Sequence, residues 1–296
     1  MNGLLVIDKP AGMTSHDVVG ILRKIAGERS IGHLGTLDPM ATGVLPLLLG
    51  KFTRLAQYFS SAEKCYSGTI RFGFATDTYD AEGEPAGPDR WPELQPLITL
   101  ERLRAAAVRF HGEMEQMPPP FSAKKIAGTP AYKLAREGKP VELKAAAVNI
   151  AEFEITTLEG AEASFEMSIS AGGYVRSVAH ELGMELGCGA HLSSLRRTRA
   201  GVFTLEGAHT LEELKPLAGS VEQLEALCVH PRRLLLEMPA VTGDALALGK
   251  LRNGAQANLP EFSRAPLVKV FASQRDLVGI AKRVAGTLFQ PVVVMG

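Results

Sequence analysis

Hydrophobic and polar positions near the start of the chain follow two different periods, and each period predicts a different element. Residues 3–8 (GLLVID) form an apolar run of strand length that stops at the turn-forming KPAGM. Between residues 18 and 25, apolar side chains recur at helical spacing. Ser15 is placed to cap this helix, and Gly27 follows its end. A strand followed by an amphipathic helix therefore opens the fold.

Similar patterns continue along the middle of the chain. Residues 64–74 (KCYSGTIRFGF) alternate, which places Tyr66 on one face of a strand together with Gly68, Ile70 and Phe72. Strands and helices are mixed without a regular βαβ repeat, which indicates an α+β fold with a mixed, largely antiparallel sheet flanked by helices. The further elements are a helix at 99–111 capped by Thr99, strands near 141–157 and 163–170, a helix near 174–186 and a strand near 191–206.

The last part of the chain has a different pattern. Residues 208–230 are helical and acidic, and residues 237–243 (EMPAVTG) contain the Pro and Gly expected at a domain boundary. Beyond them, short strands alternate with turns, which predicts a small β-barrel. We therefore divide the chain into a large domain at 1–236 and a small domain at 237–296.

Charge is balanced over the whole chain but not along it. The 296 residues carry 32 basic and 32 acidic side chains, so net charge alone does not indicate a nucleic-acid partner. From Gly249 to the end, basic residues clearly outnumber acidic ones, and residues 195–199 read LRRTR. These two basic segments are consistent with phosphate contacts, although two solvated faces would give the same pattern.

Cysteine usage and the N-terminus bear on where the protein acts. Cys65, Cys188 and Cys228 are far apart and form no CxxC pair, which is typical of a reducing compartment. The N-terminal sequence lacks the basic and apolar regions of a secretory signal. The chain also contains no apolar run of about 18 residues that could span a membrane. We expect a cytoplasmic protein with no membrane partner.

Candidate chemistry centres on the loop GHLGTLDPMATG at 32–43. An Asp before Pro, such as Asp38, is usually a turn residue. Here Gly32 and Gly35 permit close backbone approach and an apolar run follows, so the carboxylate is placed to be desolvated. With a cation to offset its charge, it would be a usable nucleophile or base. His33 could stack on or hydrogen-bond to a ligand, or be an ordinary surface residue.

Several other candidates also have plain structural interpretations. Tyr66 on an alternating strand suits a core aromatic as well as a stacking surface. Arg176 near a helix start suits a surface ion pair. His180, Cys188 and His191 invite a zinc interpretation, but Cys188-x-x-His191 has no second ligand pair. We expect no metal.

Five segments carry a stronger signal because they occur in a fixed order. Each resembles a motif of the TruB family of tRNA pseudouridine synthases, and together they span about residues 3–205. The C-terminal barrel is similar to a PUA domain, an RNA-binding module. The segments are LLVIDKPAGMTSHDVV (4–19), GHLGTLDPMATGVLPLLLG (32–50), KCYSGTIRFGFATDTYDAEG (64–83), PPPFSAKKIAGTPAYKLAREG (118–138) and SAGGYVRSVAHELGMELGCGAHLSSLRRTRAG (170–201).

The resemblance implies a catalytic centre and its immediate partners. Asp38 matches the catalytic aspartate. Tyr66 matches the tyrosine that stacks on the flipped uracil, and Arg176 matches the arginine that pairs with the catalytic carboxylate. The implied reaction breaks and remakes a glycosidic bond and needs neither redox chemistry nor an electrophilic metal, so we expect no cofactor.

The resemblance also implies the surroundings of that centre. Leu195 matches an apolar residue of the base pocket, and His33 matches the histidine beside the extruded nucleotide. Lys9 and Tyr174 lie in motifs that line the active cleft. Residues 115–140 match an inserted segment that grips RNA.

The implied activity is isomerisation of uridine 55 in the T-loop of tRNA to pseudouridine, with residues 1–236 as the catalytic domain. The tRNA partner would be held by its T-arm stem-loop, and its acceptor end could reach the PUA-like domain at 237–296. We expect a monomer. The sequence departs from the family pattern at backbone and RNA-contact positions, namely Phe121, Ala171, Gly173 and the pair His180 and Glu181.

Other functions stay open on the sequence. A catalytically silent RNA-binding or RNA-folding protein could use the same scaffold, but Asp38, Tyr66 and Arg176 are all present. A guide-RNA-dependent enzyme acting on ribosomal RNA is disfavoured by the 115–140 insertion and the single C-terminal module. A metal hydrolase around His180 lacks ligands.

Overall fold

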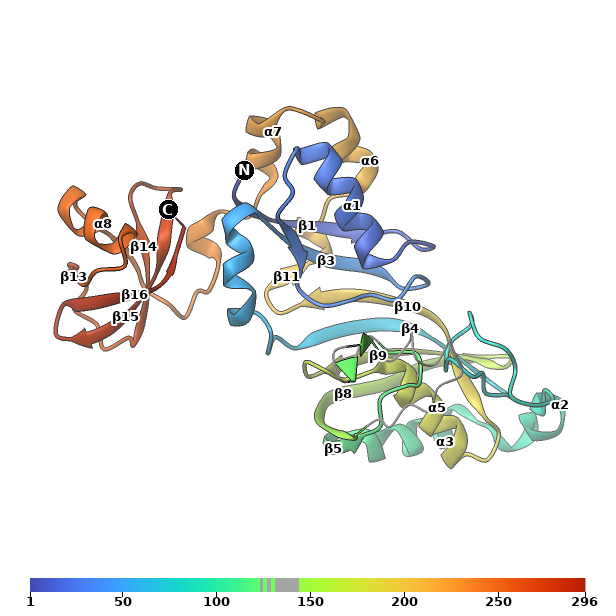
Figure 1. Cartoon of the computed structure of the whole chain (residues 1–296). Coiled ribbons are helices and arrows are strands. Elements are labelled where there is room, and N and C mark those ends of the chain that lie inside the picture. Colours follow the sequence, from blue (N-terminus) through green and yellow to red (C-terminus); the bar gives the residue numbers. More distant parts are fainter. Residues whose placement is uncertain (123–124, 127–128, 131–143, 296) are drawn as a thin grey trace.

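The computed structural model describes residues 1–122, 125–126, 129–130 and 144–295. Its elements form a large mixed sheet with helices against it and a smaller curled sheet set to one side (Figure 1). This architecture confirms the α+β fold class expected from the sequence pattern. Part of the insertion expected at 115–140 lies outside the described residues.

The large sheet is built from strands distributed over the first two hundred residues. They are β1 (Gly3–Lys9), β2 (Ile31–His33), β3 (Thr42–Leu49), β4 (Lys64–Phe72), β5 (Gly112–Gln116), β8 (Ala146–Glu159), β9 (Glu162–Ile169), β10 (Ala190–Ala200) and β11 (Phe203–Thr204). Their order is β1-β3-β10-β4-β9-β8-β5, with β2 paired to β3 and β11 paired to β10. Neighbours are antiparallel except β3 and β10, which run in parallel.

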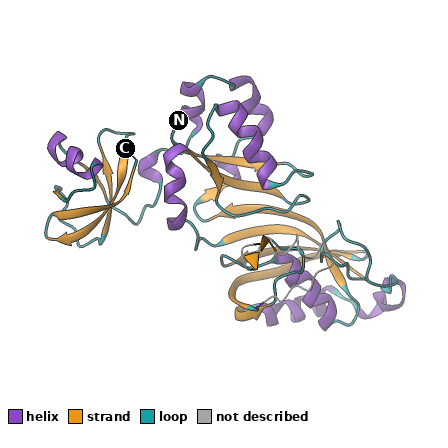
Figure 2. Ribbon diagram, viewed as in Figure 1, coloured by secondary structure: helices purple, strands orange, loops and turns teal. Residues whose placement is uncertain are grey.

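Helices pack against this sheet near both of its ends, while β4 and β10 cross the middle of the molecule (Figures 1 and 2). Against the strands, α5 packs on β10, α3 packs on β8 and α6 packs on β1. The short strands β6 (Lys125–Ile126) and β7 (Thr129–Pro130) form a separate two-stranded sheet. The helices of this part are α1 (Ser15–Ala26), α2 (Trp91–Leu94), α3 (Leu100–Ala107), α5 (Val175–Glu185), α6 (Leu211–Leu214) and α7 (Val221–Leu227).

The start of α1 differs from the sequence prediction, because its N-cap is Thr14 and not Ser15. The Thr14 hydroxyl accepts a hydrogen bond from the Asp17 amide, and the Asp17 carboxylate accepts one from the Thr14 amide. Ser15 instead faces inward and bonds both backbone groups of Leu37. The predicted end is confirmed, since Gly27 has the left-handed φ of 60° that a C-cap glycine allows.

The smaller sheet has five strands in the order β12-β14-β15-β16-β13. It packs around its own apolar cluster, which includes Val241, Leu251, Val268 and Phe289. Its strands are β12 (Ala240–Thr242), β13 (Ala257–Asn258), β14 (Leu267–Phe271), β15 (Leu277–Ala285) and β16 (Leu288–Val294), accompanied by helix α8 (Ala245–Arg252).

A second apolar cluster joins the two sheets, and we call it the junction cluster. Members from both sheets and from the segment between them pack together, so apolar contacts hold the smaller sheet against the larger one. The members include Leu4, Val44, Leu48, Phe52, Phe203, Leu234, Leu235, Phe271, Ile280 and Val293. The division at residue 237 stays a prediction, and each of the two parts also has an apolar cluster of its own.

No helix among the described residues is both long and apolar enough to cross a membrane.

Candidate active site

The loop that carries Asp38 leaves β2 and returns into β3, and it is fixed from behind by a buried lysine. The Lys9 ammonium is fully buried and donates hydrogen bonds to the carbonyls of Pro39 at 3.2 Å and Ala41 at 2.7 Å. It also donates to the Pro10 carbonyl at 2.8 Å. Burial lowers the pKa of Lys9 to about 8. The end of β1 thereby sets the path of the backbone just after Asp38.

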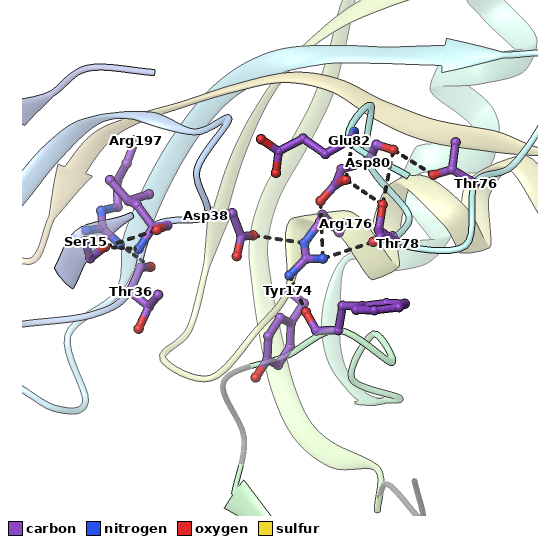
Figure 3. A network of polar contacts seen from close by, with 12 residues as sticks. Ser15, Thr36, Asp38, Thr76, Thr78, Asp80, Glu82, Tyr174, Arg176 and Arg197 are labelled. Atoms are coloured by element: carbon purple, nitrogen blue, oxygen red, sulfur yellow. Dashed lines mark hydrogen bonds and ion pairs between the residues drawn. The ribbon is translucent and has the colours of Figure 1, made fainter. Parts of the chain in front are cut away.

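Arg197 of β10 fixes the other half of the same loop. Its side chain is fully buried and donates to the carbonyls of Val44 at 2.7 Å, Gly35 at 3.1 Å and Thr36 at 3.3 Å. In Figure 3, Arg197 lies on the opposite side of Asp38 from the polar cluster around Arg176. The Asp38 loop thus rests on two buried cations that bond backbone oxygens.

Close approach of β3 to β10 requires a glycine at position 43. Gly43 lies opposite Arg197 in the parallel ladder and has a φ of +99°. A Cβ added at Gly43 would lie 2.2 Å from the Arg197 carbonyl oxygen, well inside van der Waals contact. The glycine therefore lets the Asp38 loop and the β10 backbone meet.

Arg176 faces Asp38 from the first turn of α5 and holds two carboxylates at once. Its Nε lies 2.9 Å from Asp38 Oδ2, and its Nη1 lies 3.3 Å from Asp80 Oδ2 (Figure 3). Nη1 also donates to the Thr78 carbonyl at 3.0 Å, and Nη2 donates to the Phe121 carbonyl at 3.0 Å. The side chain is only 5% exposed, and each of the three nitrogens of this buried guanidinium has a protein partner.

The surroundings of Asp38 favour its neutral form more than water does. Burial raises the pKa of Asp38, nearby Asp80 raises it further, and Arg176 opposes the rise. One-third of the side chain is still exposed, so the carboxylate faces the cleft while its solvation is incomplete. A carboxylate with a raised pKa is a stronger base and nucleophile than one in water.

Beside Asp38 lies a cleft of about 290 Å³, which we call the active cleft. Tyr66 from β4, Leu195 from β10 and Tyr174 at the start of α5 line it together with Asp38 and Arg176. Tyr66 is 8% exposed, and burial raises its pKa, while Arg197 beside its hydroxyl opposes that shift. An aromatic ring and an aliphatic side chain thus form walls next to a reactive carboxylate.

Gln116 holds the backbone that supports Tyr174. Its amide nitrogen donates to the Tyr174 carbonyl at 3.0 Å, and its amide oxygen accepts from the Tyr174 N–H at 2.8 Å. Gln116 is 1% exposed. Its side-chain amide makes the pair of hydrogen bonds that a neighbouring strand would make to the backbone of Tyr174, just before α5 begins.

The structure brings most of the expected site residues together, but not all. Asp38, Tyr66, Tyr174, Arg176 and Leu195 line the active cleft. Lys9 is behind the loop and touches backbone only. His33 lies in β2, where the sequence predicted a loop. Within the described residues its Nδ1 has no hydrogen-bond partner, and burial lowers its pKa.

The basic segment LRRTR combines one buried arginine with two arginines that are ion-paired and partly exposed. Arg197 is fully buried under the Asp38 loop. Arg196 pairs with Asp8 at 2.7 Å and Arg199 pairs with Glu63 at 2.8 Å. Both paired side chains are 40% exposed, so a contact of this segment with phosphate stays a prediction.

The residues considered for zinc are used elsewhere. His180 stacks on Tyr79 with ring centroids 3.8 Å apart. His191 Nδ1 lies 3.0 Å from the Phe74 carbonyl, and the Cys188 thiol points to the Gly183 carbonyl. Across the part of the chain that the structure describes, no group of His, Cys, Asp and Glu gathers as a metal site.

The fold agrees with that of chains in two solved complexes. A chain in the crystal structure of a Cbf5-Nop10-Gar1 complex matches with a TM-score of 0.70 and 26% identity, over 99% of this chain and 85% of that one. A chain from an H/ACA RNP bound to a substrate RNA containing 2'-deoxyuridine has the same fold, with a TM-score of 0.70. Residues 23–175, which include Asp38 and most of the large sheet, match a pseudouridylate synthase family model, so the protein falls in the class of pseudouridylate synthases, which are isomerases.

Family models and curated relatives narrow the class. Residues 23–175 match the TruB family pseudouridylate synthase N-terminal domain, and residues 176–238 match the tRNA pseudouridylate synthase B C-terminal domain. The tRNA pseudouridine synthase B of Solibacter usitatus (strain Ellin6076) is 44% identical over the full length of both chains. That of Aquifex aeolicus (strain VF5) is 38% identical over 97% of this chain and 98% of its own. The chain belongs to the TruB family.

Sequence reasoning gave no role to three residues that shape this site. Asp80 shares Arg176 with Asp38, Gln116 supports Tyr174, and Arg197 carries the Asp38 loop. Asp80 and Arg197 lie inside the quoted segments TDTYD and LRRTR, so their positions were visible while their contacts were not. Gln116 had no signal, because a buried amide that imitates a strand looks like any polar residue in a loop.

Proposed function

We propose that this protein isomerises uridine 55 in the T-loop of tRNA to pseudouridine, with Asp38 as the catalytic carboxylate. The observation that carries the proposal is the Arg176-paired carboxylate of Asp38 in a cleft walled by Tyr66 and Leu195. The relatives that match the whole chain are named tRNA pseudouridine synthase B, which supports tRNA as the substrate.

The reaction requires the uracil to leave its stack, because the carboxylate cannot reach the ribose of a stacked nucleotide. Extrusion costs a few kcal/mol, and stacking on an aromatic ring returns about 1–3 kcal/mol per base. The Tyr66 ring at the cleft wall supplies that stacking surface. Leu195 on the neighbouring strand β10 gives the base an apolar neighbour.

Within the cleft the C1′–N1 bond breaks, the uracil turns over, and a C1′–C5 bond forms. Asp38 begins this either by attacking C1′ or by removing a proton from the sugar, and both routes use a carboxylate of raised basicity. N1 ends with a proton and C5 loses one, so atoms balance without oxidant or reductant. No cofactor is required. We assign the transfer of the C5 proton to Tyr66 or Asp38, which both line the cleft.

The rest of the chain would grip the tRNA body. We assign residues 1–236 to catalysis and residues 237–296 to a PUA-like RNA-binding domain. The T-arm stem-loop lies on the former, and the acceptor end reaches the latter. His33 and the 115–140 insertion would contact the extruded loop. The basic excess after Gly249 suits phosphate contacts. We propose that the enzyme works as a monomer in the cytoplasm.

The test is incubation with one unmodified tRNA transcript, followed by mapping of pseudouridine at nucleotide resolution. The expected product is a single pseudouridine at position 55. A transcript with cytidine at 55 and the Asp38→Asn variant are the matched controls, and both should give none. Modification at another tRNA position, or in ribosomal RNA alone, would contradict the assignment of the substrate.

A further inference from the structure

A stacked pair of rings lies one helical turn beyond the Arg176 contact. Tyr79 and His180 have ring centroids 3.8 Å apart and planes only 10° from parallel. His180 follows Arg176 by four residues on α5, so the two side chains lie on one face of the helix, one turn apart. The loop that contains Tyr79 and Asp80 therefore contacts α5 at two points. Asp80 pairs with Arg176, and Tyr79 stacks on His180.

Tyr79 has an unusual backbone conformation for a tyrosine. Its φ is +66°, in the left-handed region that bulky residues rarely adopt. This conformation turns the chain so that the carbonyl of Thr78 and the carboxylate of Asp80, the residues on either side, both reach Arg176 Nη1. A strained conformation persists only where neighbouring contacts over-determine it.

The other side of this turn is pinned to β10. The Leu192 amide donates to the Tyr79 carbonyl at 3.0 Å, and the Ala81 amide donates to the Leu192 carbonyl at 3.0 Å. These bonds fix the backbone ends of the turn but do not restrain the Tyr79 ring. The stack on His180 supplies that restraint.

The His180 ring is suited to stacking and to little else here. Its Nδ1 is buried and has no hydrogen-bond partner among the described residues. Burial lowers the pKa of His180, so the ring that meets Tyr79 is uncharged at neutral pH. A neutral ring loses less on burial than a charged one.

We propose that the Tyr79–His180 stack is a positioning device that holds the Thr78–Asp80 turn against Arg176 and so fixes the guanidinium that faces Asp38. Tyr79 and His180 are positioning residues, since neither lines the active cleft. The inference rests on the proposed function, because Arg176 and Asp38 are the pair whose geometry it controls.

The test compares variants that remove the ring with variants that keep it. Tyr79→Gly accepts the positive φ without strain, Tyr79→Asn tolerates it, and both delete the ring. His180→Ala removes the partner. Tyr79→Phe and His180→Phe keep a stack and serve as matched controls.

The main measurement is the single-turnover rate of pseudouridine formation at saturating tRNA, together with tRNA affinity. Loss of the stack should lower the rate about tenfold and leave the affinity unchanged. The two Phe variants should keep the wild-type rate. The double variant Tyr79→Gly with His180→Ala should also lose about tenfold, not a hundredfold, because both changes remove one contact.

Several outcomes would overturn the proposal. Unchanged rates in the ring-deleted variants would do so, as would multiplied losses in the double variant. A fall in affinity at constant rate would make Tyr79 an RNA contact instead. A loss in Tyr79→Gly that Tyr79→Asn does not share would assign the effect to backbone freedom.

Amide hydrogen exchange in the free protein gives a readout that needs no substrate. The amides of Tyr79, Glu82 and Gly83 bond within this turn. They should exchange faster in the ring-deleted variants and normally in the Phe variants. If the wild-type protein makes no pseudouridine in tRNA, the proposed function fails, while exchange still decides whether the stack holds the turn. Equal exchange in all variants would refute the device.

Discussion

The active cleft and the junction cluster are both buried, yet they are held together by different interactions. Around the cleft, Lys9, Arg176 and Arg197 are almost inaccessible and donate to carbonyls and carboxylates. The junction cluster is apolar on both sides, and the buried cation near it is Lys269, which donates to the carbonyls of Arg232 and Leu234. Directional bonds dominate the first region and apolar contact dominates the second.

The difference follows from what each region has to fix. Apolar packing holds two surfaces together but tolerates small rearrangements among side chains of similar size. Hydrogen bonds from a buried guanidinium specify where each acceptor lies. For the proposed reaction, the cleft must hold one carboxylate at a fixed position relative to the uracil. The junction must only keep two sheets in contact. Substitutions in the two regions should therefore separate reaction rate from stability.

The largest expected effect is at Asp38. Asp38→Asn should lower the single-turnover rate by about 10⁴-fold or more, because the amide can neither attack nor accept a proton. tRNA affinity should change little, since the shape of the side chain is kept. A rate within tenfold of wild type would remove Asp38 from the chemistry.

Asp38→Asn should lower the reaction rate but should not lower the stability of the fold at neutral pH. The folded-state pKa of Asp38 lies above its ordinary value of 3.8, so the native state binds more protons than the unfolded state just above that pH. The contribution of Asp38 to stability is therefore full below pH 3.8 and is lost as pH rises through the raised pKa. At neutral pH the Asn variant should unfold at an equal or higher temperature than wild type, and scans across pH would check the slope.

The next largest effect is expected at Arg176, which both offsets the charge of two carboxylates and fixes their positions. Arg176→Met leaves Asp38 and Asp80 near each other without their shared cation, which should cost about 3–5 kcal/mol of stability. The acid limb of the rate profile should move to higher pH, because Arg176 is the main group that lowers the pKa of Asp38. Arg176→Lys keeps the charge but cannot bond all the acceptors at once, so it should restore stability more than rate.

A matched pair of lysines tests the comparison most directly. Lys9 is 0% exposed and Lys269 is 2% exposed, and both donate to backbone carbonyls. Replacing either with Met leaves buried acceptors unpaired and should cost about 1–3 kcal/mol of stability. Lys9→Met should also slow the single-turnover reaction, because the Asp38 loop loses its support. Lys269→Met should leave the rate of the folded enzyme unchanged, and equal slowing by both would break the distinction.

The smallest effects are expected at Tyr66. Tyr66→Phe keeps the ring, so binding of the flipped base should survive, whereas Tyr66→Leu should lose about 1–3 kcal/mol of base capture. Single-turnover rates at saturating tRNA then report on the hydroxyl. A Phe variant that binds normally but releases no finished product would assign the C5 proton to Tyr66, and a fully active Leu variant would return Tyr66 to the apolar core.

The fold could be predicted from the sequence where the spacing of hydrophobic residues along one segment determines its secondary structure. The alternation at Lys64–Phe72 and the helical spacing from Val18 to Ile25 both correspond to the observed elements. The cap at Thr14 was missed because serine is, in isolation, a somewhat better N-cap than threonine. The local capping box with Asp17 and the distant contact of Ser15 with Leu37 together decide for Thr14.

The site was accessible where one residue type at one position carries the chemistry, as at Asp38. Its supports were not, because nothing local marks a charged residue as buried. Lys9 and Arg197 look like surface cations until the carbonyls that surround them come from distant segments. Asp80 and Gln116 were missed for the same reason, since their partners are Arg176 on α5 and Tyr174 at its N-cap.

The parallel pairing of β3 with β10 has a consequence for how the enzyme is made. Arg197 and Val44 are 153 residues apart in the chain, and β10 is the strand that separates β3 from β4 in the sheet. During synthesis the N-terminal segments emerge first, and β10 reaches them only after most of the chain has been translated. A nascent chain or fragment that ends before β10 has an Asp38 loop without Arg197 beneath it and an Asp38 without the β10 wall of its cleft. We therefore expect a chain that ends before β10 to be unable to modify RNA.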